Sequence, residues 1–246
     1  MHRSFLRFFL AIAFVAPVAG VAHAQDDGTA KGVNPKDNIT KFDVILKSDV
    51  LERDVRIRSL SFKYDRALGP NWGVQMEVPL IRFESPGLDD SGLGDLQFRA
   101  RYVTTIGAIS YLAAGELIAP TASGDALGLG QWQLNPVVGA VFAISRHAFV
   151  YAGYKHLWSF AGDDERPDVN ASQPRVLAAY TSPKGWWVLG DLKYTRDHEA
   201  RLDALDSEAE VGTMLSPTTA ISMRVGTSSL DSPRLSTISL NARVIF

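Results

Sequence analysis

The last ten residues of the chain alternate between polar and apolar side chains as far as Val244, and the chain then ends on Ile245 and Phe246. One face of this segment carries Ile238, Leu240, Ala242, Val244 and Phe246. The other face carries Thr237, Ser239, Asn241 and Arg243. Successive side chains of a strand point to opposite sides, so the pattern predicts a strand with one apolar and one polar face. A soluble domain usually ends on frayed polar residues, whereas this chain ends on a large aromatic on the apolar face.

The same alternation, interrupted by turn-forming residues, predicts twelve strands in all. They lie near 40–50, 54–67, 71–84, 94–106, 109–120, 131–145, 147–160, 173–182, 186–196, 206–214, 218–228 and 236–246. Many have the ~9–11 residues that a tilted strand needs to cross a bilayer. The first strand is the least clear, and ten strands remain possible. The alternation also changes phase near Arg58, which predicts a β-bulge there.

The connections between these strands fall into two classes. Residues 68–70, 106–108, 145–146, 182–185 and 216–217 form short turns. The alternate connections, at 85–93, 121–130, 161–172, 197–205 and 231–235, are mostly longer and more polar. Short periplasmic turns and longer external loops are typical of outer-membrane barrels. The short connection at 50–53 is the exception.

The N-terminus has the features of a cleavable export signal. Arg3 and Arg7 precede an apolar run at residues 8–16, and Ala22-His23-Ala24 supplies a small-residue exit site. The run is too short for a spanning helix, which needs ~20 apolar residues. We predict a signal peptide at residues 1–24, cleaved after Ala24, and a flexible periplasmic segment at residues 25–39. The barrel would then occupy residues 40–246.

Composition narrows the possible functions. The whole chain has a formal net charge of −2, and its basic residues never form a run, which argues against nucleic-acid binding. Mean hydropathy is close to zero. A barrel accommodates this value because half of each strand faces lipid and half faces water. There is no cysteine, so the chain forms no disulfide.

Apolar sets along the predicted strands mark the lipid-facing side. One set comprises Trp72, Val74, Met76, Val78 and Leu80. Aromatic residues recur beside the predicted strand ends, at Trp72, Tyr102, Trp132, Trp158, Tyr180 and Trp186. Such rings suit the boundary between lipid tails and headgroups.

The opposite face is rich in charges of both signs. Candidates for the lumen or solute path are Glu77, Asp95, Arg99, Arg101, Glu116, Arg175, Lys193, Arg224 and Arg243. Inside a closed barrel such residues line water or pair with one another. A soluble sandwich could expose them to solvent, but its other face would then need a single dry core. The mixture of signs argues against a strongly ion-selective pore.

Together, these features resemble a bacterial outer-membrane β-barrel. The expected fold is all-β: a transmembrane, antiparallel, up-and-down barrel preceded by a signal peptide. The resemblance implies that Phe246 is part of an assembly signal read by the barrel-assembly machinery. It also implies contact with outer-membrane lipids and lipopolysaccharide. Loop acids at 89, 90 and 163–165 could bind the divalent ions of that layer, but the pattern favours ordinary solvated loops.

Two motifs are more specific than the alternation. Ser91-Gly92-Leu93-Gly94-Asp95 opens one strand, and residues 116–121 read Glu-Leu-Ile-Ala-Pro-Thr before a loop that ends in Gly128-Leu129-Gly130. This pair resembles the outer-membrane family of meta-pathway phenol-degradation proteins, also described as transporters. The resemblance covers most of residues 71–160. Ala122-Ser123 and Leu129 depart from the family pattern in the loop.

The resemblance implies passive transport, with an aromatic solute as a weak implication. At the motif, Asp95 is expected to point inward and pair with Arg99, Arg101 or Arg175. It would then either clamp the external loop or contact solute. We therefore expect a passive transporter for a small hydrophobic or aromatic solute. A structural barrel plugged by its own ion pairs and acting through its loops is the alternative.

A lipid-modifying barrel enzyme would need a serine and a histidine within hydrogen-bond reach. If the hairpin is symmetric about its loop, His156 lies opposite about Leu177 and far from Ser172. The sequence therefore predicts no catalytic residues. Beyond the expected signal peptide there are three scattered histidines, at 147, 156 and 198, and no cysteine, which predicts no metal site and no cofactor.

Overall fold

The computed structural model describes residues 30–246, and the expected signal peptide lies outside them. Twelve strands form the wall of a closed antiparallel barrel. They are β1 (Lys41–Leu51), β2 (Arg56–Ala67), β3 (Trp72–Ser85), β5 (Leu96–Ile106), β6 (Ile109–Ala119), β7 (Gln131–Ala143), β8 (Ala148–Gly162), β9 (Asn170–Thr181), β10 (Trp186–Asp197), β11 (Asp203–Ser216), β12 (Thr219–Leu230) and β13 (Arg234–Ile245). A short strand, β4 (Leu88–Leu93), extends the line of β5.

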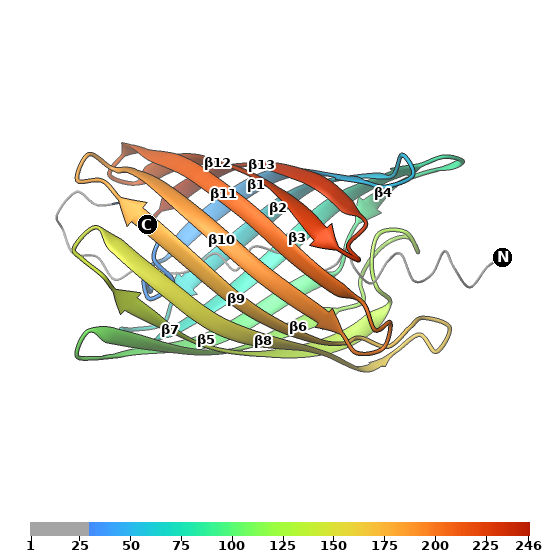
Figure 1. Cartoon of the computed structure of the whole chain (residues 1–246), viewed down its shortest axis with the longest axis horizontal. Helices are drawn as coiled ribbons and strands as arrows, with labels where there is room; N and C mark the ends of the chain where they lie inside the picture. The colour runs from blue at the N-terminus through green and yellow to red at the C-terminus, as the bar shows by residue number, and fades with distance from the viewer. Residues whose placement is uncertain (1–29) are drawn as a thin grey trace.

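Neighbours in sequence are neighbours in the barrel, and β1 closes the ring by pairing with both β13 and β2. The strands tilt together around the barrel axis (Figure 1). The predicted up-and-down barrel of about twelve strands is confirmed. Within residues 30–246, no helix has the length and apolar character to cross a membrane.

The predicted bulge near Arg58 is wrong. The β1–β2 ladder runs without interruption from Lys41 opposite Asp65 to Val50 opposite Arg56. Ile57 lies on the lumen side and joins a buried apolar cluster there. The change of phase in the sequence therefore reflects an apolar residue that faces inward, not a shift in register.

The predicted loop at 85–93 is also different in the structure. β4 pairs with the far half of β3 to form a hairpin, which projects beyond the wall at the end that carries the long loops (Figure 1). The strand bends between β4 and β5, where Gly94 N donates to Pro79 O over 2.8 Å. Pro79 has no N–H of its own to give to the ladder, so the bend falls where one ladder bond is already missing.

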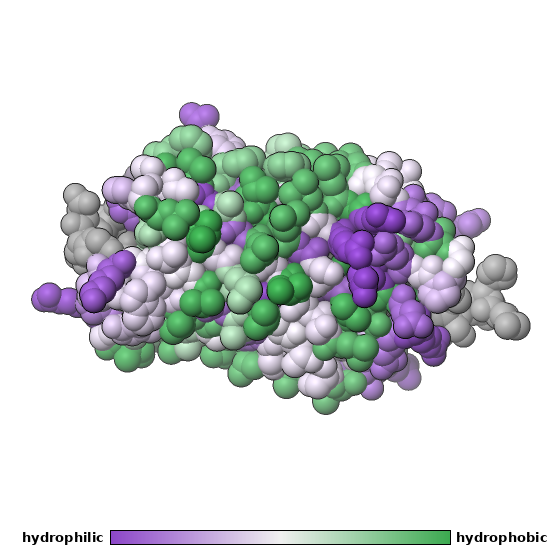
Figure 2. Space-filling view, turned by 90° about the horizontal axis from the view of Figure 1, so that it is seen from above, coloured by the Kyte–Doolittle hydropathy of each residue, from purple (hydrophilic) through white to green (hydrophobic). Residues whose placement is uncertain are grey.

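The outer face carries the predicted apolar sets and aromatic residues. Leu80, Val188, Ile221 and Leu240 are each close to half exposed, and Trp72 is 55% exposed. In the space-filling view, hydrophobic side chains gather over the middle of the wall and hydrophilic ones toward its ends (Figure 2). Below, "turn end" denotes the end of the barrel with the short turns, and "loop end" denotes the opposite end.

Candidate solute pathway through the barrel

Glu116 on β6 is the centre of one polar cluster on the lumen wall. Its carboxylate accepts hydrogen bonds from Arg99 on β5, from Lys155 Nζ on β8 (2.9 Å) and from Asn135 Nδ2 on β7 (3.2 Å). Arg99 also reaches Gln75 Oε1 on β3 over 3.4 Å. One carboxylate thus binds two cations, and the contacts join five strands of the wall.

Arg224 on β12 is the centre of a second cluster. Its guanidinium lies 2.6 Å from Glu210 and 3.3 Å from Glu208, both on β11. It also lies 3.3 Å from Asp191 on β10, which in turn pairs with Arg175 on β9. These contacts link four consecutive strands.

Two further predicted cations of the lumen follow the same rule. Lys193 Nζ on β10 lies 3.0 Å from Asp206 on β11. Arg243 Nε on β13 lies 2.7 Å from Asp43 on β1, and its Nη1 donates to Gly32 O over 2.7 Å. These pairs are therefore also held close to the wall.

All of these salt bridges run around the wall. Each joins side chains on adjacent strands or on strands two apart. In a twelve-strand ring the opposite wall is six strands away. The ion pairs described here therefore coat the lumen surface and do not tie opposite walls together.

Glu77 and Arg101 complete the predicted set on the wall strands. Glu77 on β3 lies opposite Lys63 on β2, and neither Glu77 Oε2 nor Lys63 Nζ has a hydrogen-bond partner in the described chain. Arg101 Nη2 on β5 donates to Asn38 Oδ1 over 3.1 Å. Lys63, Glu77 and Arg101 are all buried in the structure.

Asp95 has a different role from the other charged candidates. It lies at the bend between β4 and β5, where its carboxylate accepts from Leu129 N (2.8 Å) and Ala122 N (3.2 Å). The expected partners Arg99, Arg101 and Arg175 are wrong. The carboxylate fastens both ends of the loop at residues 120–130, which we call the loop-end cover.

The two sequence motifs meet at this clamp. Thr121 Oγ1 accepts from Leu96 N over 3.0 Å, and Ser123 N donates to Leu93 O over 2.9 Å. Gly128 passes so close that a Cβ there would lie 2.5 Å from Asp95 Oδ1. Only glycine allows the loop backbone to approach the carboxylate this closely. The clamp is therefore built by residues that are 25 to 35 positions apart in sequence.

Apolar side chains hold the middle of the loop-end cover. Leu127 packs with Leu51, Ile57 and Phe83 from β1, β2 and β3, whereas Leu129 belongs to a separate buried cluster with Leu157. A polar contact supports the far side, where Arg166 donates to Asp125 O over 3.0 Å. The cover thus extends from the β6–β7 corner across part of the mouth to β1.

The turn end of the lumen is apolar on one wall. Its buried side chains include Phe149, Tyr151 and Trp187 from β8 and β10. Ala30 and Val33, which precede the first strand, pack against this same cluster. The sequence predicts a flexible segment here, but from residue 30 onward the structure places it inside the mouth. We call residues 30–38 the turn-end segment.

Asn38 fixes the other end of the turn-end segment. Its Nδ2 donates to Gly69 O (2.7 Å) and Trp72 O (2.6 Å) at the β2–β3 turn, and its Oδ1 accepts from Arg101. With Gly32 O bound by Arg243, the segment has anchors on two sides of the ring. Contacts across the lumen therefore come from this segment and from the loop-end cover.

The expected separation of His156 from Ser172 is wrong. The two residues lie directly opposite each other, because β8 extends to Gly162 and β9 begins at Asn170, which shifts the hairpin register. Ser172 Oγ lies 2.9 Å from His198 Nε2 and 2.9 Å from Tyr154 OH on the outer face. In residues 30–246, no group of three or more potential ligands could hold a metal ion.

Sequence reasoning did not select several residues of this pathway. Asn135 shares its face with Gln131 and Gln133, and this polar alternation was the available signal. Trp187 is 2% exposed and faces inward, where its Nε1 donates to Glu210 over 2.9 Å. Adjacent strand residues face opposite sides, so the lipid-facing parity of Trp186 was the signal that places Trp187 inward. Asn38 lies in a segment with no periodic pattern.

Comparison with known proteins places the fold among outer-membrane channels. An outer membrane channel from Pseudomonas putida F1 is 16% identical and matches with a TM-score of 0.72 over 91% of this chain and 100% of that one. The KdgM porin is 10% identical (TM-score 0.63, 84% and 99%), and the CymD monoaromatic hydrocarbon channel is 8% identical (TM-score 0.51, 93% and 94%). At these identities the likeness is one of fold. No protein-family model matches the chain, and no curated protein matches it.

Proposed function

We propose that this protein is a passive channel of the bacterial outer membrane for a small hydrophobic or aromatic solute. The observation that carries the proposal is the course of the ion pairs around the wall. Arg99, Arg175, Lys193 and Arg224 each pair with an acid on a neighbouring strand, so none of these ion pairs crosses the barrel axis. The barrel fold shared with several channels supports the same function.

The solute class is inferred from two surfaces along the lumen. The turn end offers buried aromatic rings at Phe149, Tyr151 and Trp187, and the middle offers guanidinium groups such as Arg99 and Arg101. Aromatic side chains stack on the ring of an aromatic solute, whereas guanidinium groups bind its carboxylate or phenolic oxygen. The similar fold of CymD, a monoaromatic hydrocarbon channel, agrees with an aromatic solute. The motif resemblance to phenol-degradation proteins agrees with it as well.

Solute flux into liposomes tests this proposal. The refolded protein should pass small aromatic acids and phenols faster than sugars of similar size. Arg99→Ala and Arg101→Ala should change the rate for the acids more than for the phenols, since only the acids carry a carboxylate. Arg66→Ala is the matched control, because Arg66 is exposed on the outer face of β2. A folded barrel that passes none of these solutes would contradict the channel function.

The proposed orientation places the short turns in the periplasm and the long loops outside the cell. The chain has no cysteine, so a single introduced cysteine reports its own accessibility. On intact cells, an impermeant thiol reagent should label Asp164→Cys in a long loop and leave Pro183→Cys in a short turn unlabelled. The opposite result would reverse the orientation.

The proposed assembly signal is Phe246. Its side chain is 76% exposed and continues the apolar outer face of β13, whereas its backbone N donates to Thr40 O over 3.0 Å. Deletion should lower the amount of heat-modifiable barrel in outer membranes and leave the refolded barrel nearly as stable, since few contacts are lost. Normal membrane levels would argue against recognition by the assembly machinery.

A lipid-modifying enzyme is the second candidate, favoured only by the Ser172–His198 contact. A serine hydroxyl at 2.9 Å from an imidazole meets the distance condition for an activated nucleophile. Labelling by a fluorophosphonate, abolished in Ser172→Ala, would establish it. Absence of labelling in the folded protein would leave the channel as the sole proposal.

A further inference from the structure

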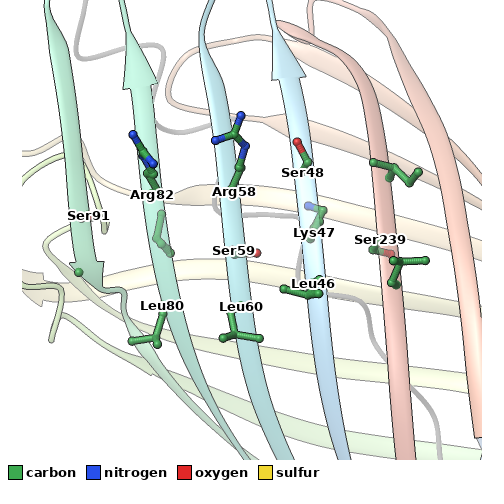
Figure 3. A pocket seen from close by; sticks show the side chains of 14 residues that line it. Leu46, Lys47, Ser48, Arg58, Ser59, Leu60, Leu80, Arg82, Ser91 and Ser239 are labelled. Atoms are coloured by element: carbon green, nitrogen blue, oxygen red, sulfur yellow. The ribbon is translucent and has the colours of Figure 1, made fainter.

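A groove of about 600 Å³ lies on the outer wall, where β13, β1, β2, β3 and β4 pass side by side. Its floor is aliphatic and comprises Leu46, Leu60, Leu80, Ile238 and Leu240. Leu46, Leu80 and Leu240 are between 44% and 53% exposed. Figure 3 shows the labelled leucines in one row across neighbouring strands, with Arg58 and Arg82 in a second row nearer the loop end.

The two arginines are held in place by carboxylates to one side of the groove. Arg58 Nη1 lies 3.2 Å from Glu84. Arg82 makes a two-point contact with Asp89, at 3.1 Å from Nε and 2.7 Å from Nη2. Each guanidinium has five N–H donors. Arg58 Nε and Nη2 and Arg82 Nη1 have no hydrogen-bond partner in the described chain, so both groups are oriented and retain donors for a ligand.

The arginines lie at the border of the lipid-facing band. On the outer face of β3, the apolar residues run from Trp72 near the turn end to Leu80, and Arg82 follows. Ten residues of strand cover roughly 34 Å, and a tilt of about 40° reduces the height to roughly 26 Å. The apolar band of an outer-membrane barrel is about 25 Å tall. Arg58 and Arg82 therefore stand at the level of headgroups, with the leucine row at the level of acyl chains.

We propose that this groove binds the phosphorylated, multiply acylated glycolipid of the outer leaflet, the lipid A part of lipopolysaccharide. An acyl chain lies along the leucine row, and a phosphate on the sugar accepts hydrogen bonds from Arg58 and Arg82. Guanidinium groups bind phosphate through paired N–H donors and keep their charge when partly shielded from water. The proposal rests on the outer-membrane orientation given above.

The shape of the site favours this glycolipid over a phospholipid. The β3–β4 hairpin projects beyond the wall beside the arginines, so a bulky sugar headgroup has a protein surface to rest against (Figure 1). Glu84 and Asp89 exclude anions from one side of each guanidinium by repulsion, which confines the phosphate to the groove side. A terminal phosphate monoester also offers more acceptor oxygens than the diester of phosphatidylglycerol.

The test is binding by the purified, folded barrel in detergent micelles. We expect lipid A carrying both phosphates to be retained on the wild type, and its dephosphorylated form at least about tenfold less, because the dephosphorylated form lacks the charged oxygens that accept from Arg58 and Arg82. The double variant Arg58→Ala/Arg82→Ala should lose the same preference. Arg66→Ala, on the same face of β2 at the turn end, should behave as the wild type.

Two outcomes would overturn the proposal. One is equal retention of both lipid A forms by the wild type and the double variant, and the other is binding of phosphatidylglycerol as tight as that of lipid A. Heat-modifiability verifies folding, and Arg58→Lys/Arg82→Lys serves if the alanine variant does not fold, since it keeps the charge and loses the paired donors. Solute flux measured without lipid A reports on the channel separately, so failure of one function is distinguishable from failure of the other.

Discussion

A different chain segment lies across each end of the barrel, and different kinds of contact hold the two segments in place. The loop-end cover is fastened by a carboxylate, Asp95, to two backbone N–H groups and is seated by Leu127. The turn-end segment packs Ala30 and Val33 on an apolar wall and is fastened by Asn38 at its far end. The middle of the lumen differs from both, because its contacts stay on the wall. Passage of a solute therefore depends on the two ends more than on the charged middle.

Removal of the Asp95 carboxylate should have the largest effect at the loop end. Asp95→Ala loses two charge-assisted hydrogen bonds, and we expect the cover to be held less tightly by about 2–3 kcal/mol. A cysteine introduced at position 127 should therefore react faster with a thiol reagent in Asp95→Ala than in the protein that keeps Asp95. Asp95→Asn is the matched control, because one amide oxygen still accepts a single N–H. Unchanged reactivity in Asp95→Ala would remove the clamp from the account.

A charge introduced into the turn-end segment should release that segment from the aromatic wall at the turn end. Val33→Asp loses about 2 kcal/mol of apolar burial and sets a carboxylate against the aromatic wall. Hydrogen exchange of residues 30–38 should accelerate, with little change in the strands. Lys31→Gln makes the same one-unit charge change two residues from Val33 without altering the apolar cluster. Equal exchange in both variants would mean that the apolar contact does not hold the segment.

A smaller effect is expected from Ile57, which packs in one apolar cluster with Leu127 of the loop-end cover. Ile57→Val removes one buried methylene and should cost about 1 kcal/mol, measured as a lower midpoint of heat-modifiability. In the Asp95→Ala background the two costs should not add, because both act on one loop. Simple additivity would show that Ile57 stabilises the wall and not the cover.

The barrel follows from the sequence because side-chain alternation is a local property that each strand carries by itself. The outward set of β13 and the aromatic positions such as Trp72 were predictable for this reason. Ile57 was misread because an apolar residue that faces the lumen looks, in sequence, like a change of register. The partners of Asp95 were missed because backbone N–H groups leave no signal in a sequence.

Hairpin register and the turn-end segment were beyond sequence reasoning for other reasons. His156 lies opposite Ser172 because of the register in which β8 pairs with β9. The sequence of a polar loop does not fix that register. The turn-end segment is short and aperiodic, so its seat at Val33 depends on a wall assembled from distant strands. Parity along the strands selected the nine charged candidates for the lumen, whereas the contacts that they make with neighbouring strands required the structure.

Single-channel conductance of the refolded barrel tests the central claim, that the lumen is a path whose openness is set at its ends. The wild type should conduct, deletion of residues 30–38 should raise the conductance, and Asp95→Ala should raise it further when the two changes are combined. Arg99→Ala should alter ion preference with less effect on conductance. Absence of conductance in all of these heat-modifiable barrels, the double variant included, would contradict the account and favour a structural role.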